Sequence, residues 1–189
     1  MLKQENGRII YHYDAEELWI ESWGKNAVRI RATKNAEMPK DNWALLSAEE
    51  VETQIEITED GATLRNGKVK VCISNGGKIT IYNQKGKLLL EEYWRNRRDL
   101  RDSKCSAIEV EAREFRPNVG GDYHLTMRLQ SLDKNEKIYG MGQYQQPYLN
   151  LKGADLELAH RNSQASVPFA ISSMGYGLLW NNPGVGRVV

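Results

Sequence analysis

Cysteine, histidine and phenylalanine are scarce in this chain, and their scarcity excludes several classes of site. The 189 residues include two cysteines, three histidines and two phenylalanines. Cys72 and Cys105 lack metal-ligand spacing, so we expect two free thiols rather than a disulfide or a metal site. The histidines are scattered along the chain and give no ligand set. We therefore expect neither a metal nor another cofactor.

Charge of one sign and long apolar runs are also lacking. Lysine and arginine number 26 against 25 acidic residues, a net charge of +1. This balance gives no electrostatic footprint for nucleic acid. No run approaches the roughly 18 apolar residues of a membrane span. The start MLKQENGR lacks the apolar segment of a secretory signal, and no Asn-x-Ser/Thr site occurs. We expect a cytoplasmic protein with no nucleic-acid or membrane partner.

Short alternating apolar runs, separated by turn residues, make up most of the chain. Asp60-Gly61, Asn66-Gly67 and Lys85-Gly86 supply the positive φ angles of tight hairpins. The charged stretch YWRNRRDLRDSK is interpreted as a solvated connection. About a dozen strands without a helical pattern predict an all-β fold, an antiparallel β-sandwich forming one domain over residues 1–189. The runs interpreted as strands are RIIYHY, ELWIESWG, AVRIRAT, VETQIEI, ATLR, KVKVCIS, KITIYN, KLLLEE, SAIEVEAREF and DYHLTMRLQS.

The segment from Lys137 to Arg187 combines three further strand patterns, KIYGM, SVPFAIS and YGLLW, with one long loop. The loop runs from about residue 143 to residue 164 and mixes aromatic, amide and charged side chains with little periodicity. A loop of this length is usually functional or disordered. Its tyrosine, glutamine, asparagine, arginine and histidine side chains are of the kinds that stack on a sugar or bond its hydroxyls.

Several separated motifs in this segment carry a family resemblance. YGMGQ, LKGADLEL, HRNSQ, VPFAISSMGYGLLWNN and PGVGR occur in an order similar to that of the N-terminal β domain of glycoside hydrolase family 31. The stretch GRIIYHYDAEELWIESWGKNAVRIRATKNAEMP resembles the first strands of the same domain. The resemblance implies a galactose-mutarotase-like supersandwich, the domain that precedes the catalytic barrel in these α-glucosidases and α-xylosidases.

The same resemblance places the chemistry outside this chain. Glycoside hydrolysis uses two flanking carboxylates, and in family 31 both are aspartates of a (β/α)₈ barrel. The strand–helix alternation of such a barrel is absent here, and GVGRVV reads as a strand about to be continued. We expect no catalytic residue in this chain; Asp155 and Glu157 are not interpreted as a catalytic pair. The implied function is the N-terminal domain of a retaining α-xylosidase or α-glucosidase, with the C-terminal barrel and an oligosaccharide as partners.

The resemblance also implies that a loop of this domain contributes to the substrate rim. An Arg-Asp pair often precedes the next strand in the family, and Arg161 and Asn162 stand at those positions. Asparagine keeps an acceptor and adds a donor but removes the charge. His160, Gln143 and Tyr144 are the other candidates for substrate binding. The alternative is that Arg161 pairs with a local acid and Asn162 makes a turn.

Two other functions remain open from the sequence. A stand-alone carbohydrate-binding β-sandwich without catalysis would have a similar size and use exposed aromatics as sugar platforms. An aldose epimerase would need acid and base groups on one concave face, and the histidines form no such set. A homo-oligomer also remains open, because a domain that normally docks on a barrel exposes an apolar patch.

Overall fold

The computed structural model describes residues 1–42, 44–95 and 105–189. Most of the stretch interpreted as a charged connection, residues 93–104, therefore lies outside the described residues. The described ranges contain strands β1 to β17 and no helix, and so no helix able to cross a membrane. They form two compact units, one of Met1–Lys40 with Ser47–Leu132 and one of Asp41–Leu46 with Asp133–Val189. The single domain over 1–189 stays a prediction, and each unit is described by itself.

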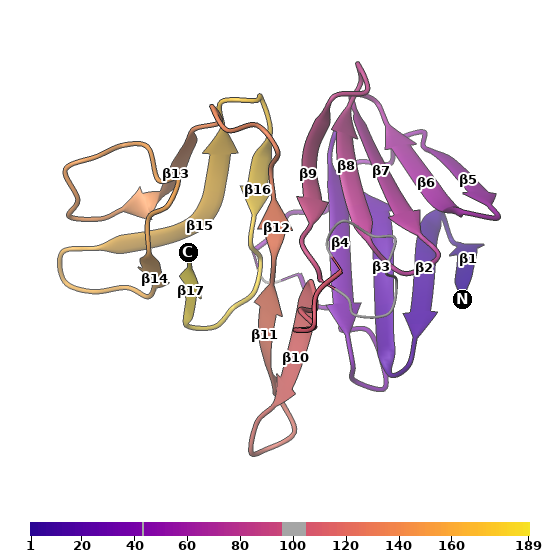
Figure 1. Cartoon of the computed structure of the whole chain (residues 1–189), viewed down its shortest axis with the longest axis horizontal. Helices are drawn as coiled ribbons and strands as arrows, with labels where there is room; N and C mark the ends of the chain where they lie inside the picture. The colour runs from indigo at the N-terminus through magenta and orange to yellow at the C-terminus, as the bar shows by residue number, and fades with distance from the viewer. Residues whose placement is uncertain (43, 96–104) are drawn as a thin grey trace. The chain divides into compact units, whose positions relative to one another are not determined.

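The first unit contains two antiparallel sheets and a two-stranded ribbon (Figure 1). One sheet has the order β1-β2-β3-β4, from β1 (Leu2–Glu5), β2 (Arg8–Tyr13), β3 (Glu16–Ser22) and β4 (Val28–Thr33). The other has the order β12-β9-β8-β7-β6-β5, from β5 (Gln54–Thr58), β6 (Gly61–Asn66), β7 (Val69–Ser74), β8 (Ile79–Asn83), β9 (Leu88–Glu92) and β12 (Leu129–Gln130). The ribbon pairs β10 (Arg113–Pro117) with β11 (Tyr123–Met127).

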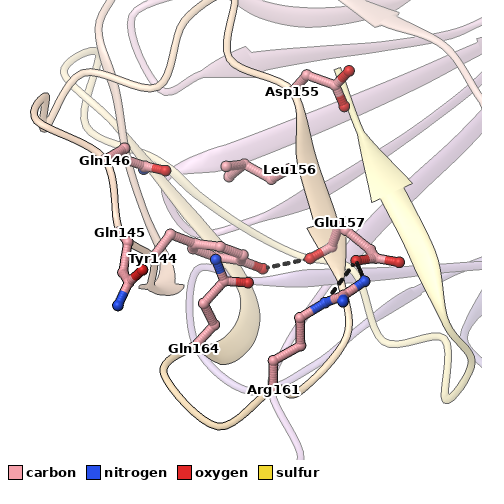
Figure 2. A pocket seen from close by; sticks show the side chains of 8 residues that line it. All are labelled: Tyr144, Gln145, Gln146, Asp155, Leu156, Glu157, Arg161 and Gln164. Carbon is pink, nitrogen blue, oxygen red and sulfur yellow. Dashed lines mark hydrogen bonds and ion pairs between the residues drawn. The ribbon is translucent and has the colours of Figure 1, made fainter.

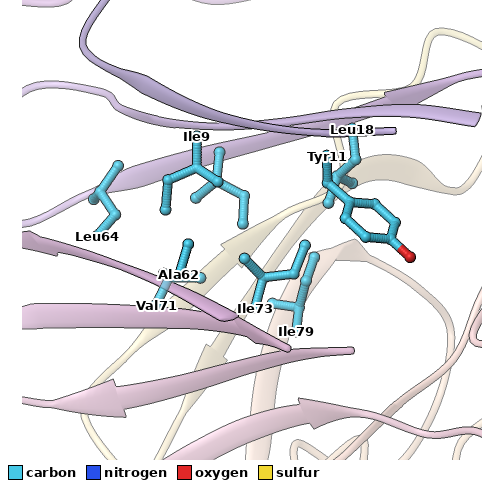
Figure 3. Packing of buried hydrophobic residues seen from close by; sticks show 9 residues of the cluster. Ile9, Tyr11, Leu18, Ala62, Leu64, Val71, Ile73 and Ile79 are labelled. Atoms are coloured by element: carbon cyan, nitrogen blue, oxygen red, sulfur yellow. The ribbon is translucent and has the colours of Figure 1, made fainter. Parts of the chain in front are cut away.

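The inward faces of these two sheets form the core of the first unit. In Figure 3, side chains of β2 and β3 face those of β6, β7 and β8 across the gap between the sheets. This arrangement follows from strand periodicity, because alternate residues point to the same side. The prediction of an all-β sandwich is confirmed. The buried cluster consists of Ile9, Tyr11, Leu18, Ile20, Ala62, Leu64, Val71, Ile73 and Ile79.

Asn66 ties one sheet of the sandwich to the other. Its side chain is buried, and Nδ2 donates hydrogen bonds of 2.7 Å to the main-chain oxygens of Gly24 and Ala27 in the β3–β4 turn. In return, Asn26 Oδ1 of that turn accepts a 2.8 Å bond from the Lys68 main-chain nitrogen. The Asn66-Gly67 pair predicted from its turn chemistry therefore also satisfies two turn carbonyls of the other sheet.

A buried charge network connects β9, β10 and β3. The Arg113 guanidinium bonds Glu92 and Glu16, and Nη2 donates to the Gly77 carbonyl at 3.1 Å. Burial raises the pKa of Glu92, although Arg113 and the Ile79 main-chain nitrogen both favour its carboxylate. Burial also opposes the charge of Arg113, but the two carboxylates outweigh this and raise its pKa. The arginine therefore stays charged between its partners.

The second unit contains a three-stranded sheet, β13-β15-β16, and a separate β14–β17 pair. Their bounds are β13 (Ile138–Gln143), β14 (Leu156–Leu158), β15 (Ala165–Ser172), β16 (Gly177–Leu179) and β17 (Gly186–Val188). The strand β14 lies inside the segment predicted as a long loop. A second apolar cluster, made of Met141, Leu151, Ala154, Leu156 and Leu158, forms the core of this unit.

A bulge in β13 shapes the start of the long loop. The register with β15 shifts between Gly140 and Gly142, and Met141 between them adopts a positive φ of 65° while its side chain stays buried. Gly142 has a φ of 101°, and a Cβ placed there would lie 2.1 Å from the Ala165 carbonyl oxygen. Glycine is needed here because β15 passes against its backbone.

Two strand predictions are wrong in their extent, and β1 was not predicted. The alternating run from Ser106 to Phe115 is strand only from Arg113 onward, and Ile108 is 73% exposed. The second run breaks at Arg128, which bonds Ala112 and Tyr93 rather than continuing β11 into β12. Alternation alone does not make a strand; a partner must also be within reach. Both cysteines are free and half-buried, which confirms the prediction that they form no disulfide.

Candidate functional site

A cavity of about 390 Å³ opens in the second unit, between the start of the long loop, β14 and the turn before β15. Tyr144 and Leu156 supply its apolar surface. Three glutamines and three charged residues surround them (Figure 2). The cavity is lined by Tyr144, Gln145, Gln146, Asp155, Leu156, Glu157, Arg161 and Gln164.

Tyr144 is fixed by hydrogen bonds to two other segments. Its hydroxyl donates to the main-chain oxygen of Glu157 at 3.0 Å and lies 3.0 Å from Ser166 Oγ. A phenol has one proton, so Ser166 is the donor in the second bond. The ring also packs against the apolar cluster of this unit. Tyr144 therefore presents a rigid aromatic surface to the cavity.

Two ion pairs supply the charge at the cavity. Arg161 approaches Glu157 with both Nε, at 3.0 Å, and Nη2, as Figure 2 shows. Arg187 of β17 bonds both carboxylate oxygens of Asp155, with Nε donating to Oδ1 at 2.7 Å and Nη2 donating to Oδ2. The hydrogen bond and charge of Arg187 hold the pKa of Asp155 below its usual value. Each carboxylate thus has its own arginine.

The remaining predicted site residues lie beside the cavity rather than in its wall. Arg161 and Gln164 exchange main-chain hydrogen bonds of 3.1 Å, and Asn162 lies exposed in the turn between them. His160 is exposed, and its Nδ1 accepts a 3.4 Å bond from the Ser166 main-chain nitrogen. Gln143 pairs with Ala165 on the opposite face of the sheet from the apolar cluster. The structure brings Tyr144 and Arg161 together, and the alternative, an ion-paired Arg161 with a turn at Asn162, is also present.

The chemistry available in the cavity is recognition. An aromatic ring, three amides and two arginine–carboxylate pairs offer donors and acceptors for a polyhydroxylated ligand. Arg187 holds Asp155 in its ionised form, which does not suit a general acid, and the Glu157 carboxylate is engaged by Arg161. Within the described residues, no group of three metal-ligating side chains comes together. The described residues therefore give this unit a binding surface and no acid–base pair.

Comparison with known proteins identifies the family. Residues 17–188 match the family model described as the glycosyl hydrolase 31 N-terminal galactose mutarotase-like domain. The chain belongs to this family. An uncharacterized family 31 glucosidase from Pseudescherichia vulneris is 47% identical over 187 residues, which is 95% of this chain and 35% of that protein. The fold class and the family resemblance predicted from sequence are thereby confirmed.

Solved family 31 structures share the fold over nearly the whole chain. The α-xylosidase from a soil metagenome, solved in complex with xylose, is 45% identical with a TM-score of 0.94, covering 99% of this chain and 29% of that one. The α-xylosidase from Xanthomonas citri is 26% identical with a TM-score of 0.79, covering 98% of this chain and 19% of that one. The chain spans about a third or less of the length of these relatives.

The tryptophans bear on the alternative of a sugar-binding module. Arg8 and Arg31 lie over the Trp19 ring at 4.2 Å and 4.8 Å, and Arg29 lies over Trp23 at 4.6 Å. These cation–π contacts occupy the flat surfaces on which a sugar would stack. None of the tryptophans that the structure describes is among its exposed large side chains. Trp19 and Trp23 are therefore not free platforms of the kind that a stand-alone sugar-binding module uses.

The sequence interpretation missed β14, the strand that places Leu156 and Glu157 in the cavity wall. Leu156 and Leu158 are buried, whereas Asp155 before them and Glu157 between them are exposed. This alternation with period two is the signal that indicates a strand in GADLELAH. Gln145, Gln146 and Gln164 were noticed only as part of a polar loop, because their convergence depends on the pairing of Gln143 with Ala165 between β13 and β15.

Proposed function

We propose that this domain belongs to an α-glycosidase that hydrolyses α-xylosides, and that its Tyr144–Arg161 cavity forms part of the substrate-binding rim. The observation that carries the proposal is the similarity, over 99% of this chain, to an α-xylosidase solved with xylose. Retention of configuration and a catalytic (β/α)₈ barrel come with the family resemblance. We further propose a cytoplasmic location, which the two free thiols support.

The cavity supports a role at the rim because its groups suit neutral hydroxyls. Arg161 is about 61% exposed in its side chain, so its remaining donors face solvent even while it holds Glu157. α-Glucoside hydrolysis is the second candidate, favoured by the 47% identical relative that is called a glucosidase.

The test is turnover by the protein encoded by the complete reading frame. We expect p-nitrophenyl α-xyloside to be cleaved with a higher kcat/KM than p-nitrophenyl α-glucoside. Preference for the glucoside would replace the first candidate with the second. Absence of turnover on both substrates would overturn the proposed activity. The 189-residue chain alone is the control and should release no nitrophenol.

The contribution of the rim is tested by Arg161→Ala in the same full-length protein. We expect kcat/KM to fall by about tenfold, mainly through a higher KM, because a charged hydrogen bond to the ligand is lost while the chemistry lies elsewhere. Arg116→Ala is the matched control, since Arg116 is also an exposed arginine and is paired with a glutamate, Glu114 of β10. Equal kcat/KM values for the Arg161→Ala and Arg116→Ala variants would show that Arg161 does not contribute to the substrate-binding rim.

A further inference from the structure

One face of β15 is apolar and uncovered. Strand alternation directs Ala170 to the apolar cluster of the second unit, and the buried Ser172 to the same side. Val167, Phe169 and Ile171 point the other way and are 52%, 41% and 49% exposed. Three consecutive outward positions of one strand are therefore large, apolar and solvent-exposed.

Neighbouring strands extend this surface. Leu179 of β16 lies opposite Phe169, and Tyr139 of β13 lies opposite Ile171, so both share the face. Leu179 is also exposed. The other described residues that the register places on this face, Gln143, Ala165 and Gly177, carry no charge. We call Tyr139, Val167, Phe169, Ile171 and Leu179 the β15 face.

The Phe169 ring has a fixed place on this face. A Cβ at Gly177 would lie 2.7 Å from Phe169 Cζ, so the ring lies directly over the glycine of the next strand. Gly177 thus makes room for the aromatic side chain to lie along the sheet instead of standing free. A large apolar surface with a preset shape is typical of a protein contact.

A sugar is a poor occupant for this surface. Bound sugars need hydrogen-bond partners for their hydroxyls, and the β15 face offers only the Tyr139 hydroxyl and the Gln143 amide at its margins. The cavity with Tyr144 and Arg161 has the opposite character, with amides and charges around one ring. The second unit therefore carries one polar and one apolar surface, suited to different ligands.

The length of the relatives indicates what covers the apolar surface. The chain corresponds to 35% of the Pseudescherichia vulneris protein and 29% of the soil-metagenome α-xylosidase, so most of each relative lies outside the matched region. We propose that the β15 face is the docking surface for that further polypeptide, which covers it with apolar side chains. This inference rests on the proposed function, in which these residues are one part of a longer hydrolase.

Docking would also orient the cavity. Ser166 bonds Tyr144 and His160 from the same strand whose neighbouring residue, Val167, begins the exposed row. Fixing β15 against another domain therefore fixes the strand that holds the cavity. This places the polar surface of the unit at a constant position relative to the docked polypeptide.

The experiment is thiol labelling of Val167→Cys in the full-length protein, with the modified position identified by peptide mass spectrometry. Lys134→Cys is the control, because Lys134 is an exposed turn residue of the same unit. We expect the Val167→Cys thiol to react at least about tenfold more slowly than the control, because a covered thiol reacts only after local opening. In the 189-residue chain the two rates should agree within a few-fold.

Two outcomes would overturn the proposal. Equal rates in the full-length protein would show that nothing covers the face. Slow labelling already in the 189-residue chain, relieved by dilution, would assign the face to a second copy. Labelling is read without substrate, so an active enzyme with an exposed Val167→Cys thiol would reject the docking and keep the proposed function. A protected thiol in an enzyme that is inactive on α-glycosides would keep the docking and reject the proposed function.

Discussion

Glu136 is a buried carboxylate that joins two turns of the second unit. It is 4% exposed and accepts hydrogen bonds from Ser172 Oγ at 2.5 Å and from the Tyr176 hydroxyl at 2.7 Å. Lys152 Nζ lies 4.0 Å away. Burial, followed by the bond and charge of Glu136, raises the pKa of Tyr176 well above its ordinary value of 10.0. The phenol is therefore kept neutral as a donor to a buried charge.

Replacement of this phenol gives a pH-dependent test. Tyr176→Phe should lower the free energy of unfolding by about 2 kcal/mol near neutral pH, because a hydrogen bond to a charged group is removed. A raised folded pKa means that the stabilisation is fully present below pH 10 and is lost as pH rises through the folded pKa. The difference between wild type and variant in urea denaturation should therefore narrow above about pH 10.

Tyr13→Phe is the control for the phenol, since Tyr13 is 60% exposed. It should change stability by less than about 0.5 kcal/mol at any pH. If the loss of unfolding free energy in Tyr176→Phe stayed constant into alkaline solution, the stabilisation would not depend on the protonated Tyr176 hydroxyl that bonds Glu136.

The strand β13 shows how a single backbone feature positions the cavity. Its bulge at Met141 shifts the register with β15, and the strand ends immediately before Tyr144. Gly142 follows the bulge, and its positive φ disfavours any residue with a side chain. A Cβ at this position would also collide with the Ala165 carbonyl oxygen. The position of the Tyr144 ring thus depends on the close approach of the β13 and β15 backbones.

Gly142→Ala tests this dependence. We expect a loss of more than about 3 kcal/mol, because the positive φ costs about 1–3 kcal/mol and the Cβ must also displace the β15 backbone. Gly153→Ala isolates the first contribution, since Gly153 has a φ of 83° and open space around its Cβ position. The urea midpoint should fall much further for Gly142→Ala than for Gly153→Ala. Equal midpoints for the two variants would mean that the β15 backbone moves away from the added Cβ without an energetic cost.

At the same scale, sequence patterning predicted elements well where the partner is next in the chain. Val28 and Ile30 alternate with arginines, and Asn66-Gly67 marks a tight turn whose two loop residues are Gly67 and Lys68, so β4 and the β6–β7 hairpin follow directly from the sequence. β14 was missed because its partner β17 lies about thirty residues away, beyond what local periodicity reports. Ile108 was placed in a strand because its alternation is correct, but among the described residues no strand pairs with it.

Across the whole molecule, each apolar cluster takes its residues from one unit. Leu64→Ala in the larger cluster should lower stability by about 2–5 kcal/mol, because Leu64 is fully buried. We expect hydrogen exchange to speed up through β2, β3, β6 and β7 while the amides of β14 and β15 keep their protection. Equal acceleration in β14 and β15 would show that the two units open as one.

The cavity itself was only partly predictable. Arg161 was found through a family resemblance and Tyr144 through its aromatic side chain, and the acid that pairs with Arg161 was expected without being identified as Glu157. Gln143 was chosen for its amide, but strand direction turns it to the far face, paired with Ala165. Side-chain direction depends on register, and the bulge at Met141 sets that register in a way that no local pattern reveals.

The arginine–carboxylate pairs at the cavity have a consequence for how a ligand arrives. The charge of Arg161 balances that of Glu157, and the charge of Arg187 balances that of Asp155. These two pairs therefore give the cavity opening no net charge. Long-range electrostatic steering then does not raise the rate at which a ligand encounters the cavity, and added salt does not lower that rate. Capture of an uncharged sugar here is governed by diffusion and short-range fit, largely independent of the ionic strength around the protein.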